Sequence, residues 1–138
     1  MDDQELFALF RKNGYKVTTQ RLAIYKFMMT RKDHPTADQI YQGLKMDYPT
    51  LSFGTIYKTL HTLKELGLIQ ELGFESGSIR YDPDISPHLN VVCTNCGKIY
   101  DYKSKKMEEF WSLIVSELKI KPEGQRIDIY HECIECKN

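Results

Sequence analysis

Two Cys-x-x-Cys pairs constrain the fold of this chain more than any other feature. All four cysteines lie in the second half of the 138 residues, as Cys93-x-x-Cys96 and Cys133-x-x-Cys136. Zinc prefers four soft ligands in a tetrahedron, and each Cys-x-x-Cys turn supplies two neighbouring thiolates. The pattern therefore predicts one structural Zn²⁺ that joins two segments far apart in the sequence.

The alternative for these cysteines is the redox-active pair of a thiol oxidoreductase, which usually begins a helix after a strand. Neither motif here opens a predicted helix. A shell of four thiolates also has no open coordination position, so catalysis at this metal is not expected. The start of the chain, Met1-Asp2-Asp3, is acidic where a secretory signal is basic, and no apolar stretch is long enough to span a membrane. We therefore expect a cytoplasmic protein with reduced thiols.

Composition favours a soluble globular protein of one domain or two small ones, since 41% of residues are hydrophobic and 28% are charged. These values exclude a disordered tail or a fibrous repeat. The formal net charge is zero, but the segment from Arg11 to Lys32 contains seven basic residues and no acidic one. Such asymmetry indicates, weakly, that the first half faces nucleic acid.

The first half predicts four helices followed by a hairpin. The helices cover 3–12, a segment that begins at Thr18 or Thr19, a segment capped by Thr36, and a segment capped by Ser52. In the fourth helix an apolar stripe recurs with helical spacing at Ile56, Leu60, Leu63 and Leu66. Strands are expected at 68–74 and 79–82 around a turn at 75–78. This order is typical of a winged helix-turn-helix.

The fourth helix is the candidate DNA-reading element. Opposite its apolar stripe we expect exposed polar side chains, and no acidic residue lies between Thr50 and Lys64. Any surface helix has a polar face, so this face alone does not prove DNA binding. The predicted DNA contacts are Thr55, Tyr57 and Lys58, with Arg11, Lys16 and Arg21 for phosphates. The other residues expected on the exposed side are Thr59, His61 and Thr62.

The second half predicts a small α+β domain. Two prolines within 83–87 indicate a hinge. Strands are expected at 89–92, 98–102 and 126–131, with a helix over about 105–118. The fold class is therefore α+β, with a winged-helix domain at 1–82, a hinge at 83–87 and an α/β domain with the Cys₄ zinc site at 88–138.

The whole series of motifs resembles the ferric uptake regulator (Fur) superfamily. The resemblance covers essentially the whole chain, in order. The residues that carry it are His34-Pro35-Thr36-Ala37-Asp38, Thr55-Ile56-Tyr57-Lys58, Gly67-Leu68-Ile69, Arg80-Tyr81-Asp82, His88, Cys93-Thr94-Asn95-Cys96-Gly97-Lys98 and Cys133-Ile134-Glu135-Cys136. The resemblance implies a homodimeric DNA-binding repressor in which the second domain dimerises.

The resemblance also implies a regulatory metal site between the domains. The matching positions are His34, Asp82, His88, Asn90 and Asp101. Asp84 is a second carboxylate near the hinge that can substitute for Asp82. Such a mixed nitrogen and oxygen shell suits Fe²⁺, Mn²⁺ or Zn²⁺. One ion held by both domains would favour their DNA-competent arrangement.

Aspartates at both acidic positions resemble the peroxide-sensing, PerR-like branch. There, bound Fe²⁺ reacts with hydrogen peroxide, the oxidant adds oxygen to a ligating histidine, and DNA is released. His34 and His88 hold the oxidisable positions, and Mn²⁺ would repress without reacting. Asn90 departs from the pattern, because the family usually has a second histidine there and an amide oxygen is a weaker ligand. A further family metal site is not expected, since its positions hold Pro87, Leu89 and Gln125.

The predicted function is a metal-dependent repressor of iron-handling or oxidative-stress genes. One alternative is an iron-, manganese- or zinc-responsive repressor that does not sense peroxide. Another is a general transcription factor with a winged helix and a zinc ribbon, which would need no second metal. An enzyme is not expected, because the chain lacks a phosphate-binding glycine loop, a serine nucleophile motif and paired catalytic carboxylates.

Overall fold

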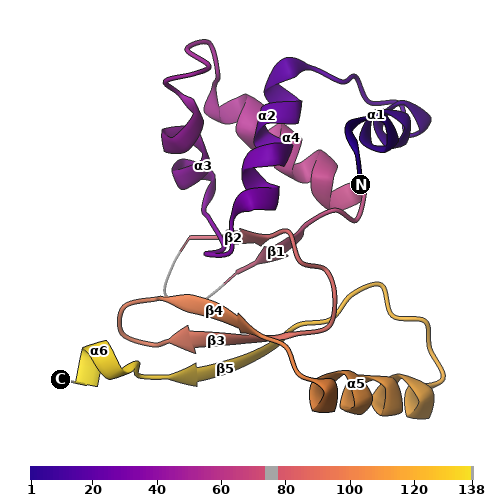
Figure 1. Cartoon of the computed structure of the whole chain (residues 1–138), viewed down its shortest axis with the longest axis vertical. Coiled ribbons are helices and arrows are strands. Elements are labelled where there is room, and N and C mark those ends of the chain that lie inside the picture. The colour runs from indigo at the N-terminus through magenta and orange to yellow at the C-terminus, as the bar shows by residue number, and fades with distance from the viewer. Residues whose placement is uncertain (74–77, 138) are drawn as a thin grey trace. The chain divides into compact units, whose positions relative to one another are not determined.

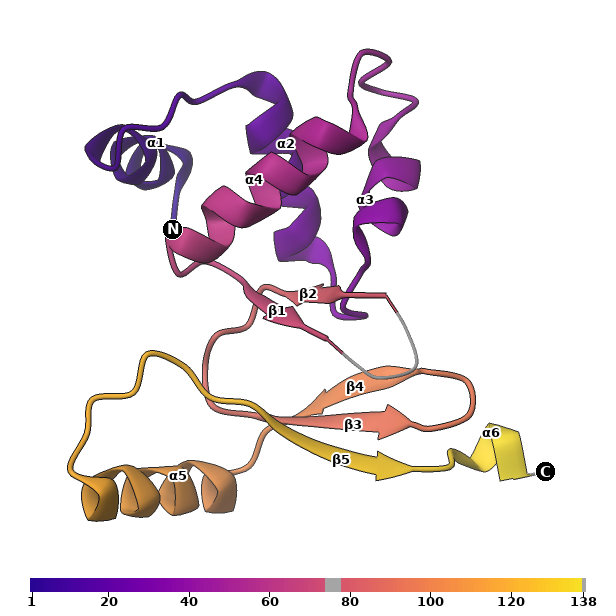
Figure 2. The same ribbon diagram turned by 180° about the vertical axis from the view of Figure 1, so that it is seen from behind.

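A computed structural model describes residues 1–73 and 78–137, which form two compact units. The first unit comprises Met1–Asp84 and the second Ile85–Asn138, so the division falls within the 83–87 segment. Figures 1 and 2 show the elements of each unit from opposite sides. No described helix has the length and apolarity needed to cross a membrane.

The first unit contains the four predicted helices and a short hairpin. The helices are α1 (Asp3–Lys12), α2 (Thr19–Thr30), α3 (Ala37–Leu44) and α4 (Phe53–Glu65). Each begins after a polar residue whose side chain accepts a backbone N–H of the first turn. These N-caps are Asp2, Thr18, Thr36 and Ser52.

The hairpin consists of β1 (Gln70–Leu72) and β2 (Arg80–Asp82), which pair antiparallel. Both strands are shorter than the predicted 68–74 and 79–82. Phe74 and residues 75–77 of the predicted turn lie outside the described residues. Helices followed by this hairpin make the winged-helix arrangement that the sequence predicts.

The core of the first unit forms around α4, which packs against both α2 and α3. The predicted stripe residues Ile56, Leu60 and Leu63 are buried. The expectation that Thr59 and Thr62 lie on the exposed side is wrong, because both are buried. Two neighbouring helices cover α4 over a wider arc than its apolar residues alone indicate.

The second unit contains a three-stranded sheet in the order β4-β3-β5. Its strands are β3 (Leu89–Cys93), β4 (Ile99–Tyr102) and β5 (Ile127–His131). β3 pairs antiparallel with β4 and parallel with β5. The crossover between β4 and β5 contains α5 (Lys105–Leu118), as predicted. The chain then forms α6 (Ile134–Lys137), so the second cysteine motif does open a short helix, contrary to expectation.

Helix α5 keeps much of its apolar surface exposed. Met107 is the one buried residue of α5, whereas Phe110, Leu113 and Leu118 are 53%, 65% and 58% exposed. Both views show α5 apart from the faces of the three-stranded sheet (Figures 1 and 2). An apolar face of this kind on a small unit indicates a surface for another polypeptide.

Candidate metal centres and nucleic-acid interface

The four cysteines form one cluster at the ends of β3 and β5. Their sulfur atoms all lie within 4.8 Å of one another. The Cys93–Cys136, Cys96–Cys133 and Cys133–Cys136 separations are 3.7, 3.8 and 3.4 Å. A tetrahedral zinc with Zn–S bonds of about 2.3 Å requires S···S separations of about 3.8 Å. The cysteines therefore fit the predicted Cys₄ zinc site.

Backbone hydrogen bonds prepare this cluster for a cation. The N–H groups of Cys133 and Cys96 donate to Cys93 Sγ at 3.3 and 3.5 Å, and they lower the pKa of the Cys93 thiol to about 5. In contrast, the hydrogen bond with Cys133 raises the pKa of Cys136, since crowded sulfur atoms retain a proton between them. A divalent cation removes this conflict because it allows all four thiols to ionise.

His34 forms a buried pair with Asp82 in the first unit. His34 Nε2 lies 3.1 Å from Asp82 Oδ2, and both side chains are 1% exposed. On the other side of the ring, Nδ1 lies 3.2 Å from the carbonyl oxygen of Lys32. The second carboxylate oxygen of Asp82 accepts the backbone N–H of Asp84 at 2.9 Å. Asp82 is therefore the carboxylate beside His34, and Asp84 orients it through its main chain.

Strand β2 holds the segment that carries His34. His34 itself has a φ of +54°, which is uncommon for a residue with a side chain. The Arg80 guanidinium donates to the His34 carbonyl at 3.2 Å, and the Tyr81 N–H donates to the Pro35 carbonyl at 3.0 Å. Since Asp82 ends the same strand, the Arg-Tyr-Asp motif fixes both the imidazole's backbone and its carboxylate partner.

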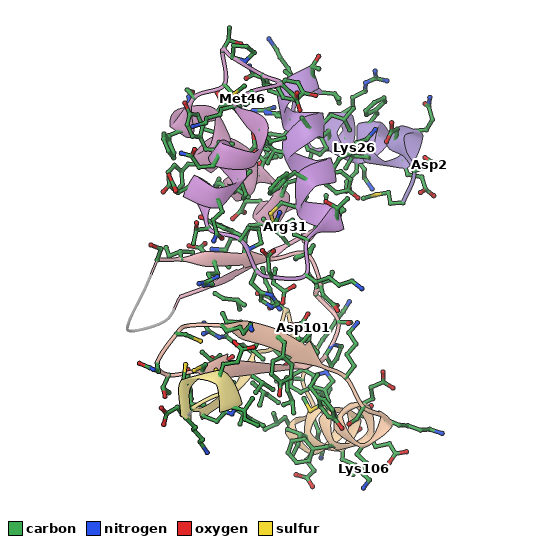
Figure 3. All side chains as sticks on the ribbon, turned by 60° about the vertical axis from the view of Figure 1, so that its left-hand side comes forward. Asp2, Lys26, Arg31, Met46, Asp101 and Lys106 are labelled. Atoms are coloured by element: carbon green, nitrogen blue, oxygen red, sulfur yellow. The ribbon has the colours of Figure 1, made fainter. Side chains whose placement is uncertain are left out.

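His88 forms a similar pair in the second unit. Its Nδ1 lies 2.7 Å from the carbonyl oxygen of Ser86, and its Nε2 lies 3.4 Å from Asp101 Oδ1. His88 immediately precedes β3, and Asp101, labelled in Figure 3, lies on the neighbouring strand β4. The antiparallel register, which pairs Asn90 with Asp101, brings the two side chains together.

The hydrogen bonds of both rings fix which nitrogen faces the carboxylate. A carbonyl oxygen only accepts, so Nδ1 of His34 and of His88 must carry a hydrogen. In a protonated ring, Nε2–H donates to the carboxylate. In a neutral ring, the Nε2 lone pair faces the carboxylate oxygen, and a cation is needed between the two atoms. Metal-binding histidines commonly donate their second N–H to a backbone carbonyl in this way. Each unit therefore presents an imidazole and a carboxylate suited to a divalent ion.

Asn90 belongs to a hydrogen-bond network that the sequence did not reveal. It lies in register with Asp101 on β4 and Asp128 on β5, so these side chains share one face of the sheet. Asn90 Nδ2 donates to Asp128 Oδ1 at 3.1 Å. Arg126 Nε and the Tyr130 hydroxyl donate to Asp128 Oδ2 at 2.9 and 3.2 Å. The amide nitrogen thus points to Asp128, and the amide oxygen is the atom suited to a metal.

The predicted DNA contacts lie on the surface of the first unit. Tyr57 is 56% exposed, Lys58 is exposed and Thr55 is half-buried on α4. A pocket of about 660 Å³ brings Thr55 and Lys58 together with two of the predicted phosphate-binding residues, Lys16 and Arg21. Arg11, the third, is exposed near the end of α1 and is not among the residues that line the pocket.

The motif order, the capped helices, the cysteine cluster and the two histidine–carboxylate pairs agree with one family of known proteins. The sequence matches the ferric uptake regulator family over residues 12–130. The chain belongs to the ferric uptake regulator family. This is a family of regulators, which agrees with the prediction that the chain is not an enzyme.

Relatives of this ferric uptake regulator family member include proteins named peroxide-responsive repressors. The chain is 38% identical over 128 residues to the peroxide-responsive repressor PerR of Staphylococcus saprophyticus, covering 93% of this chain and 86% of that protein. It is 35% identical over 135 residues to PerR of Staphylococcus aureus, covering 98% and 91%.

Solved structures of the family share the fold. The Campylobacter jejuni peroxide stress regulator has a TM-score of 0.77 at 31% identity, covering 99% of this chain and 100% of that one. The Helicobacter pylori ferric uptake regulator has a TM-score of 0.82 at 21% identity, covering 98% and 91%. At the lower identity the likeness supports the fold alone.

Cys96→Ser is expected to abolish zinc retention in this family member, because a hydroxyl is a much poorer zinc ligand than a thiolate. Metal analysis of purified protein should give about one zinc per chain for the wild type and far less for the variant. Thr94→Ser, in the same turn, is the matched control and should retain the metal. Full zinc content in Cys96→Ser would contradict the four-cysteine site.

Asp128→Asn is expected to reduce the acid sensitivity of the second unit. Burial alone would raise the pKa of Asp128, but hydrogen bonds from Arg126 and Asn90 outweigh it and hold that pKa below its usual range. Because the folded pKa is the lower one, this carboxylate stabilises the fold above its unfolded pKa. That contribution is lost as pH falls through the folded pKa.

Urea unfolding at a series of pH values below about 5 tests this expectation. Acidification also releases zinc, but it does so in both proteins. The free energy of unfolding of the wild type should therefore still fall more steeply with acidification than that of Asp128→Asn. Glu123→Gln, at an exposed position, should follow the wild type. Parallel curves for wild type and Asp128→Asn would show that the network adds no pH-dependent stability.

Proposed function

We propose that this protein is a metal-dependent transcriptional repressor whose regulatory ion is bound by His34, Asp82, His88, Asn90 and Asp101. The observation that carries the proposal is the orientation of the two imidazole rings. Each has its Nδ1–H directed to a backbone carbonyl and its Nε2 directed to a carboxylate. Family membership supplies the context in which two such pairs serve regulation rather than stability.

The two pairs serve one ion in this proposal. Two neutral imidazoles and two carboxylates balance a divalent charge, and this mixed donor set suits Fe²⁺, Mn²⁺ or Zn²⁺. Because one pair comes from each unit, the ion has higher affinity for the arrangement in which both pairs reach it. Residues 83–87 act as the hinge, and metal binding shifts the population toward the DNA-competent arrangement.

Asn90 acts as a weak neutral ligand through its amide oxygen. Asp128 holds the amide nitrogen, so the orientation of the side chain is set before metal arrives. An amide oxygen binds these ions less strongly than an imidazole. Asn90 therefore lowers metal affinity relative to a histidine at this position. This departure favours the alternative to a peroxide sensor, which is a metal-responsive repressor without peroxide sensing.

The operator is bound by the winged-helix unit of a homodimer in the cytoplasm. Tyr57, Lys58 and Thr55 contact the DNA from α4, while Lys16, Arg21 and Arg11 neutralise phosphates. A second copy covers the exposed apolar residues of α5, which include Phe110, Leu113 and Leu118. A two-fold dimer then presents two winged-helix units to a palindromic site.

Hydrogen peroxide is the proposed signal, on the strength of relatives named peroxide-responsive repressors. Bound iron supplies the redox chemistry. Overall, peroxide oxidises one ring of His34 or His88 by two electrons: one oxygen atom enters the ring and the other leaves as water. The modified ring is a poorer ligand, so the ion and then the DNA dissociate.

His34→Ala is expected to abolish metal-stimulated DNA binding, because it removes one ligand pair's imidazole. In zinc-retaining, chelator-treated protein, Mn²⁺ should tighten operator binding of the wild type by roughly 5- to 150-fold, the usual range of such coupling. Fluorescence anisotropy should show little Mn²⁺ effect for the variant, with zinc content unchanged. His131→Ala is the control and should respond to Mn²⁺ as the wild type does. Equal responses of wild type and His34→Ala would exclude the proposed regulatory site.

Peroxide is expected to add one oxygen to a ligand histidine only when iron is bound. The tryptic fragments 33–45 and 81–98 contain His34 and His88 and no methionine. After anaerobic Fe²⁺ loading and treatment with peroxide, one of them should gain the mass of one oxygen, and operator affinity should fall. Mn²⁺-loaded protein should show neither change.

The fragment 59–64, which contains His61 and no methionine, is the internal control. It should remain unmodified under both conditions. If Fe²⁺ and Mn²⁺ both tighten DNA binding and peroxide modifies no fragment, the protein is a metal-responsive repressor without peroxide sensing. If neither metal affects DNA binding, the proposed regulation fails.

A further inference from the structure

A pocket in the first unit combines features of an oxyanion site. It lies among the segment between α1 and α2, the first turn of α2, and one side of α4, and it measures about 660 Å³. Thr55, Lys58 and Thr59 line it from α4, at the i, i+3 and i+4 positions of a single helical face. Segments well separated in the sequence thus converge on one small volume.

The charge of the pocket is entirely positive. Lys16, Arg21 and Lys58 line it, and none of its lining side chains is acidic. Arg21 is already oriented, because its Nη1 donates to the Lys16 carbonyl at 2.7 Å. The arrangement favours a compact anion, and a guanidinium with a fixed direction suits a tetrahedral oxyanion in particular.

The first turn of α2 adds backbone donors. This helix is 12 residues long, and its N-cap Thr18 accepts the N–H of Arg21. The N–H groups of Thr19 and Gln20 have no partner inside the helix, as expected for the first positions of an α-helix. Both residues line the pocket, so these donors and the positive end of the helix dipole contribute at the same place.

Thr59 gives an independent indication of a ligand. Its side chain is fully buried and lines the pocket, yet its hydroxyl has no hydrogen-bond partner among the described residues. A buried hydroxyl without a partner is costly. Thr62, one turn further along α4 and also buried, donates to the Lys58 carbonyl at 3.0 Å. An oxyanion in the pocket would accept the hydroxyl hydrogen that Thr59 does not otherwise use.

We propose that this pocket binds one phosphate group of the DNA backbone, with Lys16, Arg21, Lys58, the α2 N-terminus and the Thr59 hydroxyl as donors. The proposal rests on the DNA-binding function proposed above and assigns one phosphate to one built site. Phosphate contacts carry no base information. The pocket therefore sets where the first unit sits on the duplex and contributes equally at all sequences.

Thr59→Val tests the pocket because it removes the hydroxyl and keeps the shape of the side chain. Loss of one hydrogen bond to a charged group should weaken binding to operator and unrelated DNA alike by roughly tenfold. Thr62→Val is the matched control on the same helix and should bind as the wild type does. Lys16→Gln should in addition lower the slope of log affinity against log salt by about 0.9.

Operators with a single uncharged methylphosphonate, placed at each position in turn, locate the phosphate. At one position per half-site the substitution should weaken wild-type binding, and Thr59→Val should cause no further loss there. A Thr59→Val effect no larger than that of Thr62→Val, or one that is equal at every methylphosphonate position, would overturn the proposal. Metal-stimulated operator binding would remain intact in that case, so the proposed function would stand.

Inorganic phosphate distinguishes a DNA phosphate from a free anion and tests the pocket without DNA. Amide resonances of Thr19, Gln20 and Thr59 should shift on titration with phosphate in the wild type and shift much less in Thr59→Val. Saturation at micromolar phosphate with no methylphosphonate coupling would assign the pocket to a free anion and overturn the DNA assignment. If the wild type does not bind DNA at all, this titration still decides whether the pocket takes an oxyanion.

Discussion

The direction of two imidazole rings governs how the proposed regulatory chemistry works. A backbone carbonyl takes the Nδ1–H of His34 and of His88, which leaves Nε2 against a carboxylate in each case. Neither pair is stable as two facing lone pairs, so each requires a proton or a metal ion. At His34, hydrogen bonds from Arg80 and Tyr81 hold the segment in place, and they keep His34 in a positive-φ conformation that has a conformational cost.

The cysteine cluster differs from the histidine pairs in the metal chemistry that it can support. Its four sulfur atoms match a closed tetrahedron, and backbone N–H groups already favour ionised sulfur at Cys93. A closed shell of this kind stabilises structure and leaves no position for an exchangeable ligand. The proposed structural zinc and the proposed exchangeable metal therefore use different sets of donor atoms.

Much of the fold was predictable because its signals are local. Each helix of the first unit begins at a capping residue followed by an apolar face, and the cysteine spacing is unambiguous. The burial of Thr59 was not predictable, because α2 and α3 together cover α4 beyond its apolar stripe. The hydrogen bond between Asn90 and Asp128 was also not predictable, because the sequence of neither strand determines the register of a parallel pair.

The parallel pairing of β3 with β5 has a consequence for the order in which the chain folds. The helices of the first unit form from residues close together in the sequence. In contrast, β3 pairs with β5 although β4 and α5 lie between them in the chain. Closing such a loop costs entropy before any contact repays it, which slows folding. Zinc bound by the four cysteines would join the ends of these strands and so offset that entropy. We therefore expect the first unit to fold ahead of the second, with zinc binding completing the second.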